Sequence, residues 1–204
     1  MITVIDINIG NVASVARALK HLGVEYRLSS SAEDILSAEK IIFPGVGSFS
    51  EAAKRLGELG IRDVLRSRVA KDKIPILGIC LGMQLLATTG DEGAQSQGLD
   101  LIKGRVSYHR AAQCGLKLPH IGWNEVRNSG GLRVFDSIPE ESCFYFVHSF
   151  EFIPGEAVKI AVSDYGVDFA AAIQKEHIVG VQFHPEKSQK HGLRLLDNFS
   201  KGVM

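Results

Sequence analysis

The sequence has no excess of charge of either sign. Lys plus Arg and Asp plus Glu both number 23 in a chain of 204 residues. A nucleic-acid or anionic-membrane partner usually leaves a basic excess, so its absence removes the simplest argument for either. Five basic residues fall in the helix-like stretch 62–73, where the solvated face of a helix explains them better than a binding site. We expect no nucleic-acid partner.

Cysteine is scarce, and its few copies are far apart. The chain has Cys80, Cys114 and Cys143, an odd number with no CxxC pair, which argues against a disulfide framework and against a paired metal or redox site. A zinc site would need closely spaced His and Cys ligands, and the sequence has none. We therefore expect reduced thiols, a cytoplasmic protein, no metal and no cofactor.

Long hydrophobic runs are also missing. No apolar run approaches the roughly 18 residues that a membrane span needs, and the opening stretch MITVIDINIG lacks the basic start of a signal peptide. Hydrophobic residues make up 45% and charged residues 23% of the chain, as in ordinary globular proteins. We expect one domain spanning 1–204 and no membrane partner.

Short apolar segments alternate with amphipathic segments in the first half of the chain. The former are predicted strands, and the latter, with apolar residues at helical spacing, are predicted helices. The expected strands are 2–6, 24–29, 40–45 and 74–79, and the expected helices are 12–22 (with Asn11 as its cap), 49–57, 60–71 and one beginning at Leu81. This alternation indicates an α/β fold: an open, mostly parallel twisted sheet with helices on both faces.

The second half is richer in strands with short connections. The expected strands are 101–109, 118–126, 143–150, 158–164, 168–175 and 178–184, followed by a helix at 189–201. Short connections favour antiparallel pairs. We therefore expect antiparallel additions in the C-terminal half.

Cys80 stands where the fourth expected strand meets the next helix. Gly78-Ile79-Cys80-Leu81-Gly82 has the form of a nucleophile elbow in which cysteine replaces serine. Glycines on both flanks permit the tight turn, and the helix N-terminus favours a thiolate. The Leu81 N–H can point at the oxyanion that the nucleophile creates. The alternative is a small buried hydrophobe, and the pentapeptide by itself supports both readings equally.

His184 and Glu186 form the one histidine–carboxylate pair at useful spacing near a strand end. A residue before proline is pushed to extended conformations, and in an extended chain residues i and i+2 project to the same side. Glu186 is therefore predicted to hold one ring nitrogen of His184 and leave the other for Cys80. Other histidines are weaker candidates: His109 and His120 have no acidic neighbour at useful spacing, and His148 has the pattern of a core or rim histidine.

A glycine loop follows the third expected strand, in FPGVGSF (43–49). Gly45-x-Gly47 lacks the third glycine of a dinucleotide fingerprint and the lysine of a P-loop, so a nucleotide site is not favoured. The better interpretation is a loop in which the N–H of Val46 or Gly47 supplies the second oxyanion donor. A plain turn remains the alternative.

Three stretches, PGVGSF (44–49), GICLGMQLL (78–86) and VQFHPEKS (181–188), together resemble the class I (triad) glutamine amidotransferases. Within this family, PHIGWNEV (119–126), YFVHSF (145–150) and the start VIDINIGNVASV (4–15) are most similar to glutaminase subunits of imidazole glycerol phosphate synthase. The resemblance covers essentially the whole chain. It implies a glutaminase that supplies ammonia to a (β/α)₈-barrel cyclase subunit in histidine biosynthesis, with glutamine as substrate.

The resemblance also implies residue roles. Cys80 is the expected nucleophile, His184 the acid and base, and Glu186 the group that orients it. The oxyanion and substrate pocket is expected to include Val46, Gly47, Leu81, Gln84, Glu92, His148, Ser149 and Phe150. Asn8, Asn11 and Lys187 resemble residues that face the cyclase partner.

Other functions use the same three side chains. A Cys-His peptidase or γ-glutamyl hydrolase would attack a peptide-like bond, and glutaminase subunits for anthranilate, aminodeoxychorismate, GMP or carbamoyl phosphate synthesis share the triad. A non-catalytic subunit that kept the fold is a third possibility, against which the intact Cys80, His184 and Glu186 argue.

Overall fold

The first half of the chain alternates strands and helices, as its hydrophobic pattern predicts. The computed structural model describes residues 1–203. The elements of this half are β1 (Ile2–Ile5), α1 (Val12–His21), β2 (Tyr26–Ser29), α2 (Ala32–Leu36), β3 (Lys40–Gly45), α3 (Phe49–Glu58), α4 (Arg62–Ala70), β4 (Ile76–Cys80) and α5 (Leu81–Leu85). Every predicted element is present within two residues of its expected ends, but the short helix α2 was not predicted.

The second half contributes mostly strands. They are β5 (Thr89–Gly90), β6 (Ser96–Gln97), β7 (Gly104–Tyr108), β8 (His120–Val126), β9 (Ser142–His148), β10 (Phe150–Pro154), β11 (Lys159–Asp164), β12 (Asp168–Lys175) and β13 (Ile178–Val181). Three short 3-10 turns, η1 (Arg110–Cys114), η2 (Arg133–Phe135) and η3 (Pro185–Lys187), and the final helix α6 (Gln189–Lys201) complete the chain.

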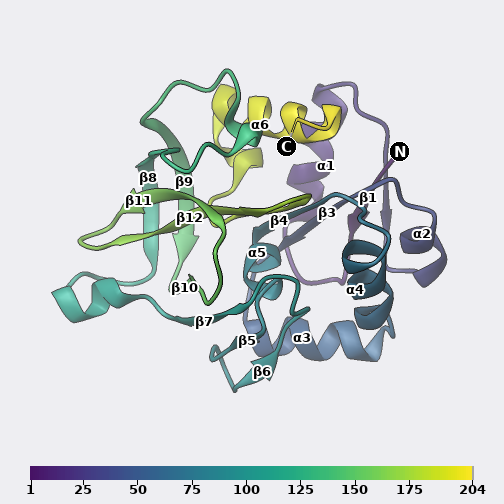
Figure 1. Ribbon diagram of the computed structural model, residues 1–204, viewed down its shortest axis with the longest axis horizontal. Helices are drawn as coiled ribbons and strands as arrows, with labels where there is room; N and C mark the ends of the chain where they lie inside the picture. The colour runs from purple at the N-terminus through teal and green to yellow at the C-terminus, as the bar shows by residue number, and fades with distance from the viewer. Residues whose placement is uncertain (204) are drawn as a thin grey trace.

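A seven-stranded sheet forms the centre of the molecule, in the order β11-β12-β13-β4-β3-β1-β2 (Figure 1). The five strands from β13 to β2 run parallel, and β12 and β11 are added antiparallel. Smaller sheets are built from β10-β7-β5-β6 and from β8-β9. The predicted fold class is therefore confirmed, although β13, expected among the antiparallel additions, is a parallel strand of the main sheet.

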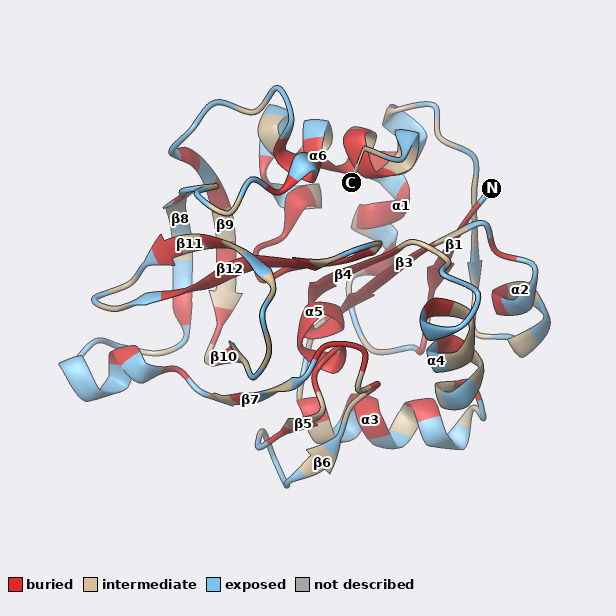
Figure 2. Ribbon diagram, in the orientation of Figure 1, coloured by how far each residue is buried: buried red, intermediate tan, exposed pale blue. Residues whose placement is uncertain are grey.

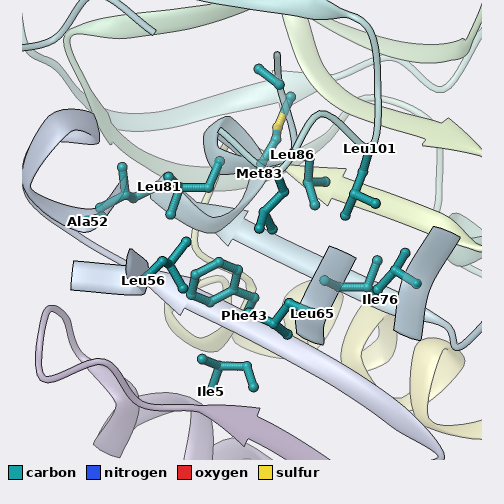
Figure 3. Close-up of a cluster of buried hydrophobic side chains, with 14 of the residues drawn as sticks. Ile5, Phe43, Ala52, Leu56, Leu65, Ile76, Leu81, Met83, Leu86 and Leu101 are labelled. Atoms are coloured by element: carbon teal, nitrogen blue, oxygen red, sulfur yellow. The ribbon is translucent and has the colours of Figure 1, made fainter. Parts of the chain in front are cut away.

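Helices cover both faces of the main sheet, so its central strands are buried (Figure 2). Side chains that alternate along each strand enter two separate cores. Ile76 of β4 packs with Phe43, Leu56 and Leu65 under α3 and α4 (Figure 3). Leu77, the next residue, packs on the opposite face with the residues of α1 and α6.

The amino terminus of α1 differs from its prediction in one respect. Asn11 does occupy the cap position, but its side chain makes no capping hydrogen bond. The cap of α3 is conventional by comparison, because the Ser48 side chain accepts from the Glu51 N–H. Of the helices among residues 1–203, none is long and apolar enough to cross a membrane.

Candidate active site

Three neighbouring parallel strands end at one edge of the main sheet, and the candidate site lies there. Gly45 at the end of β3 pairs with Cys80 at the end of β4, and Val181 at the end of β13 pairs with Ile79. Because parallel strands all point the same way, the segments that follow them meet at one edge. This register brings the glycine loop, Cys80 and the His184 segment together from distant parts of the sequence.

Cys80 occupies a strained turn between β4 and α5. Its φ of 54° and ψ of −108° are rare for a residue with a side chain. The flanking glycines are required by close packing: a Cβ on Gly82 would overlap the Phe43 carbonyl oxygen, and a Cβ on Gly78 would lie 2.6 Å from the Gly82 oxygen. The geometry is that of the predicted nucleophile elbow, which places the thiol at the start of a helix.

His184 and Glu186 are in direct contact. Nδ1 of His184 lies 2.8 Å from Oε1 of Glu186, and both side chains are 2% exposed. The contact was predicted, and His184 is extended as expected before a proline, but the chain does not stay extended through Pro185 and Glu186. Pro185–Lys187 form the 3-10 turn η3, and the Lys187 N–H donates to the His184 carbonyl. The turn, and not strand alternation, brings the carboxylate to the ring.

The backbone around His184 is held by β9 and by Ser188. The His184 N–H donates to the Tyr145 carbonyl over 2.9 Å. The Ser188 hydroxyl donates to the His184 carbonyl over 2.6 Å and accepts from the Tyr145 N–H over 3.0 Å. These bonds anchor the histidine to a neighbouring strand, so the ring is positioned by more than its own turn.

The charge state of His184 follows from its neighbours. Burial by itself lowers the pKa of His184, but the Cys80 thiolate and the Glu186 carboxylate outweigh it and raise that pKa to about 10. Nε2 of the ring is buried, and apart from the nearby Cys80 sulfur it has no hydrogen-bond partner among the described residues. The site therefore holds an imidazolium whose Nε2–H is available to a reacting group.

A cavity of about 390 Å³ opens beside Cys80. It is lined by Cys80 and by all eight residues expected for the oxyanion and substrate pocket: Val46, Gly47, Leu81, Gln84, Glu92, His148, Ser149 and Phe150. Ser48, Pro119 and Val147 also line it and were not foreseen. His184 and Glu186 are not among the lining residues; their side chains lie buried, with His184 close to Cys80.

Glu92 supplies a carboxylate to this cavity. Its Oε2 accepts from the Phe49 N–H over 3.1 Å. Burial raises the pKa of Glu92, and the Phe49 hydrogen bond partly opposes that rise. A partly buried carboxylate that keeps one backbone donor is suited to bind a cationic group.

The chain matches the family model "Glutamine amidotransferase class-I" over residues 3–203. It is 45% identical over 199 residues, with 98% of each chain covered, to "Imidazole glycerol phosphate synthase subunit HisH 1" of Campylobacter jejuni. It is 43% identical to the HisH subunit of Moorella thermoacetica over 99% of this chain and 95% of that relative. The chain belongs to the class-I glutamine amidotransferase family. The family predicted from the three motifs is confirmed.

Solved structures agree with this family in fold. A crystal structure described as a glutamine amidotransferase superposes with a TM-score of 0.77 at 22% identity, covering 98% of this chain and 97% of that one. A glutamine amidotransferase from Thermotoga maritima gives a TM-score of 0.65 at 16% identity over 98% and 82%. At such identities the likeness concerns the architecture of this amidotransferase chain and not its substrate.

The three residues expected to face a partner lie in loops of the amidotransferase fold at the same sheet edge. Asn8 and Asn11 are in the segment between β1 and α1, where the Asn8 N–H donates to Asp6 over 2.9 Å. Lys187 is exposed in η3, with Nζ 5.6 Å from the centroid of the Tyr145 ring. The loop after β1 and the turn after β13 thus flank the elbow on either side.

Two features of the site were not foreseen. Glu151, buried and paired with Arg110, lies 4.0 Å from His109, an acidic neighbour that sequence spacing does not reveal. Gln182 is fully buried, with its amide nitrogen 3.6 Å from the sulfur of Cys80. The signal for Gln182 was present as a polar residue inside the apolar run IVGVQF, two residues before His184. Residues 1–203 contain no cluster of three or more side chains that could hold a metal ion.

Proposed function

We propose that this chain is the glutaminase subunit of an imidazole glycerol phosphate synthase in histidine biosynthesis. It hydrolyses glutamine to glutamate and ammonia and delivers the ammonia to a cyclase subunit. The observation that carries the proposal is the 2.8 Å contact of His184 with Glu186 beside the elbow of Cys80. The HisH names of relatives 41–45% identical over nearly the whole chain support the choice of synthase.

The first half of the reaction forms a thioester. The Cys80 thiolate attacks the side-chain carboxamide carbon of glutamine, and the carbonyl electrons move to oxygen. When the tetrahedral intermediate collapses, the C–N bond breaks and the leaving nitrogen takes the proton from Nε2 of His184. Ammonia departs, His184 becomes neutral, and glutamyl remains bonded to sulfur. The buried Nε2 and the raised pKa of His184 support this role.

The second half hydrolyses the thioester. Neutral His184 takes a proton from water at Nε2 as the water oxygen attacks the thioester carbon. Collapse of this second tetrahedral intermediate breaks the C–S bond and releases glutamate. The thiolate and the imidazolium that started the cycle are restored, while Glu186 holds Nδ1 throughout.

Both tetrahedral intermediates carry an oxyanion next to the start of α5. The Leu81 N–H is in the first turn of that helix, where backbone donors have no intrahelical partner. A second N–H is proposed from Val46 or Gly47, since both residues line the same cavity. Loss of one such donor lowers the rate by roughly 10²–10³-fold.

The rest of the cavity is proposed to hold the amino-acid end of glutamine. Glu92 offers a carboxylate to the substrate ammonium group, and Gln84 and Ser149 offer polar side chains beside it. His148 and Phe150 complete the wall. Burial disfavours the ionised form of Glu92 and so raises its pKa, whereas a bound cation favours the ionised form. The carboxylate is therefore stabilised when a cation binds.

We assign Asn8, Asn11 and Lys187 to the face that docks on the cyclase subunit. They lie in loops at the edge of the sheet that carries Cys80, so a partner bound there would meet ammonia as it leaves. The whole of 1–204 is proposed to act as one amidotransferase domain, and a cytoplasmic location suits a biosynthetic enzyme with reduced thiols.

The test is glutamate release from glutamine, measured for the chain alone and then with the purified cyclase and its ribonucleotide substrate. We expect slow turnover alone and a large rise in the mixture. Cys80→Ala should abolish turnover in both while the circular dichroism spectrum stays native. A Cys80→Ala protein that keeps near-native turnover would end the assignment of the nucleophile.

The mixture also separates the competing functions. Turnover that ignores this cyclase would retain the glutaminase and point to a different synthase, such as one for anthranilate or aminodeoxychorismate. Cleavage of a peptide or γ-glutamyl panel, without release of glutamate from free glutamine, would point to a hydrolase. The names of the curated relatives favour neither alternative.

A further inference from the structure

Gln182 is a fully buried polar side chain next to the nucleophile. It follows β13, which runs parallel to β4 with Val181 opposite Ile79, so Gln182 and Cys80 are the next residues of neighbouring strands. Its side-chain nitrogen lies 3.6 Å from Sγ of Cys80, and the residue is 0% exposed. A buried amide without partners is strongly unfavourable, so each of its polar atoms should face a complementary group.

The Phe150 carbonyl decides which way this amide points. Nε2 of Gln84 lies 3.2 Å from the Phe150 oxygen and 3.2 Å from Oε1 of Gln182. A backbone carbonyl only accepts, so the group of Gln84 that faces it must be the NH₂. That NH₂ donates in turn to the oxygen of Gln182. The remaining end of Gln182, its own NH₂, is therefore the end that faces sulfur.

The Phe150 carbonyl also accepts a hydrogen bond from His148. Nδ1 of His148 lies 2.9 Å from the Phe150 oxygen, and its Nε2 lies 3.1 Å from Nδ1 of His120. Burial lowers the pKa of His148 to about 3, so the ring is neutral and carries its one proton on Nδ1. A flipped Gln182 would set two NH₂ groups against each other and an oxygen against sulfur.

Sγ has three polar neighbours, and one of them is the His184 ring, whose pKa the Cys80 thiolate raises. The other two, Val147 and Gln182, favour opposite states of the thiol. The Val147 carbonyl lies 3.9 Å from Sγ and can only accept, so it favours the S–H form. The NH₂ of Gln182 can only donate toward sulfur, so it favours the thiolate. Hydrogen bonds to an ionised acceptor are stronger than bonds between neutral groups. The contact with Gln182 is closer than the contact with Val147, and it becomes stronger when Cys80 loses its proton.

We propose that Gln182 is a catalytic residue of this enzyme, whose amide N–H stabilises the Cys80 thiolate and directs Sγ toward the substrate carbon. Gln84 and the Phe150 carbonyl act as positioning groups that fix the direction of the amide. Gln182 transfers no proton, and the acid–base steps remain with His184. This role in the glutaminase rests on the proposed function, whereas the contact with the thiolate does not.

The experiment compares Gln182→Met with the wild type in the full-length protein. Methionine keeps the length and the buried volume of the side chain but removes the N–H donor. Gln174→Met is the matched control, because Gln174 is a buried glutamine on the adjacent strand whose amide donates to the Glu176 carbonyl. Alkylation by iodoacetamide is followed across pH by mass spectrometry of the Cys80 peptide. The exposed Cys114 and Cys143 serve as internal references.

Gln182→Met should slow alkylation of Cys80 at pH 7 by about tenfold and move the midpoint of its alkylation–pH profile to higher pH. Cys114, Cys143 and the Gln174→Met protein should react as the wild type does. In glutamine hydrolysis, kcat should fall by a similar factor while the KM for glutamine stays within about twofold.

The proposal would be overturned if Gln182→Met folds and its Cys80 is alkylated at the wild-type rate at every pH. It would also be overturned by a raised KM with an unchanged kcat, which would mean that Gln182 acts through Gln84 on substrate binding. If Gln182→Met does not fold, Gln182→Leu is smaller and also has no donor, so it should slow alkylation by a similar factor. Wild-type reactivity of Gln182→Leu would then overturn the proposal. If the wild type releases no glutamate even with the cyclase, the proposed function fails, yet alkylation still decides the role of Gln182 toward the thiolate.

Discussion

Two histidines at the active edge of this molecule are similarly buried, but one is charged and the other is neutral. His184 is 2% exposed and His148 is 5% exposed. The pKa of His184 is raised to about 10, and the pKa of His148 is lowered to about 3. The difference lies in the charge of the groups that each ring meets: the Cys80 thiolate and the Glu186 carboxylate beside His184, and the uncharged Phe150 carbonyl beside His148.

The second environment extends beyond His148. His120 stacks between Phe146 and Tyr165, and the pKa of His120 is lowered to about 4 by burial, assisted by His109. The aromatic walls offer dispersion and no countercharge, so neutral rings are the stable form. Burial alone therefore keeps an imidazole neutral, and two ionised partners reverse that outcome. The site around His184 can therefore deliver a proton, whereas the rings of His120 and His148 stay neutral.

The largest expected effect comes from removing the charged ring. His184→Asn should lower kcat for glutamine hydrolysis by roughly 10⁴-fold or more, because no group remains to protonate the leaving nitrogen. Steady-state glutamate release in the presence of the cyclase measures it. His177→Asn is the control, since His177 bonds to the Val69 carbonyl away from Cys80. A loss below tenfold would assign the proton transfer to another group.

A smaller effect is expected from removing only the carboxylate. Glu186→Gln should lower kcat by roughly 10²-fold, because it weakens the orientation of the ring and leaves the reacting atoms in place. Glu186 raises the pKa of His184, so its loss lowers that pKa, and the alkaline limb of the pH–rate profile should move to lower pH.

Glu176→Gln provides the matched control for that change. Glu176 also contacts a histidine, His177, at 3.8 Å, but its side chain is 67% exposed. Its replacement should leave the pH–rate profile unchanged. An alkaline limb that is the same in Glu186→Gln and the wild type would show that the carboxylate does not support the imidazolium.

The neutral region can be given the countercharge that it lacks. His120→Asp places a carboxyl group beside Nε2 of His148, and we expect the pKa of His148 to rise. Burying the carboxylate should lower the free energy of unfolding at pH 7 by about 1–3 kcal/mol. A ¹⁵N NMR titration of the imidazoles measures the first effect and urea unfolding the second. His120→Asn has the same size as His120→Asp but no charge. Equal pKa values of His148 in the two variants would show that a missing countercharge is not what keeps His148 neutral.

The last prediction concerns stability in mild acid. His120 and His148 have folded-state pKa values of about 4 and about 3, below the value of about 6.5 in unfolded chains. The unfolded state therefore binds more protons than the folded state between pH 6.5 and 4. As the pH falls through this range, the free energy of unfolding should fall by about 1.4 kcal/mol per pH unit for each histidine. His184 has the opposite sign: its contribution is complete below pH 6.5 and is lost as pH rises toward 10.

Urea unfolding at pH 7, 6 and 5 tests this slope. His120→Phe keeps the aromatic stack but cannot titrate. Its free energy of unfolding should therefore change less steeply with pH than that of the wild type, by the contribution of one histidine, even though its overall stability is lower. Carboxylates contribute little in this window, because their ordinary pKa values lie near 4. Identical slopes for His120→Phe and the wild type would mean that His120 is not held neutral.

Features that depend on neighbouring residues in the chain were predictable. The alternation of strands and helices follows from hydrophobic period, and the ends of β3 and α6 were placed to the residue. Cys80 was identified because an elbow needs its own glycines, and His184 with Glu186 because they are two residues apart. α2 escaped prediction because its five residues are too few for a period to be recognised.

Features that join distant segments were not predictable. Glu151 reaches His109 across 42 positions, and Gln182 reaches Cys80 across 102. The His184–Glu186 contact was predicted from an extended chain, but only His184 is extended, and the turn η3 that follows is held by Ser188 and Tyr145. Side-chain partners of this kind are set by strand order and register, which local patterns do not encode.

Local patterns in the chain thus specify a cysteine on an elbow, a histidine beside a carboxylate and a parallel sheet to carry them, because each depends on residues within a few positions of one another. The charge of each buried histidine and the direction of the Gln182 amide were decided only by the folded structure. Both depend on which donor or acceptor lies about 3–4 Å away in an environment from which water is excluded, and that neighbour comes from a different strand.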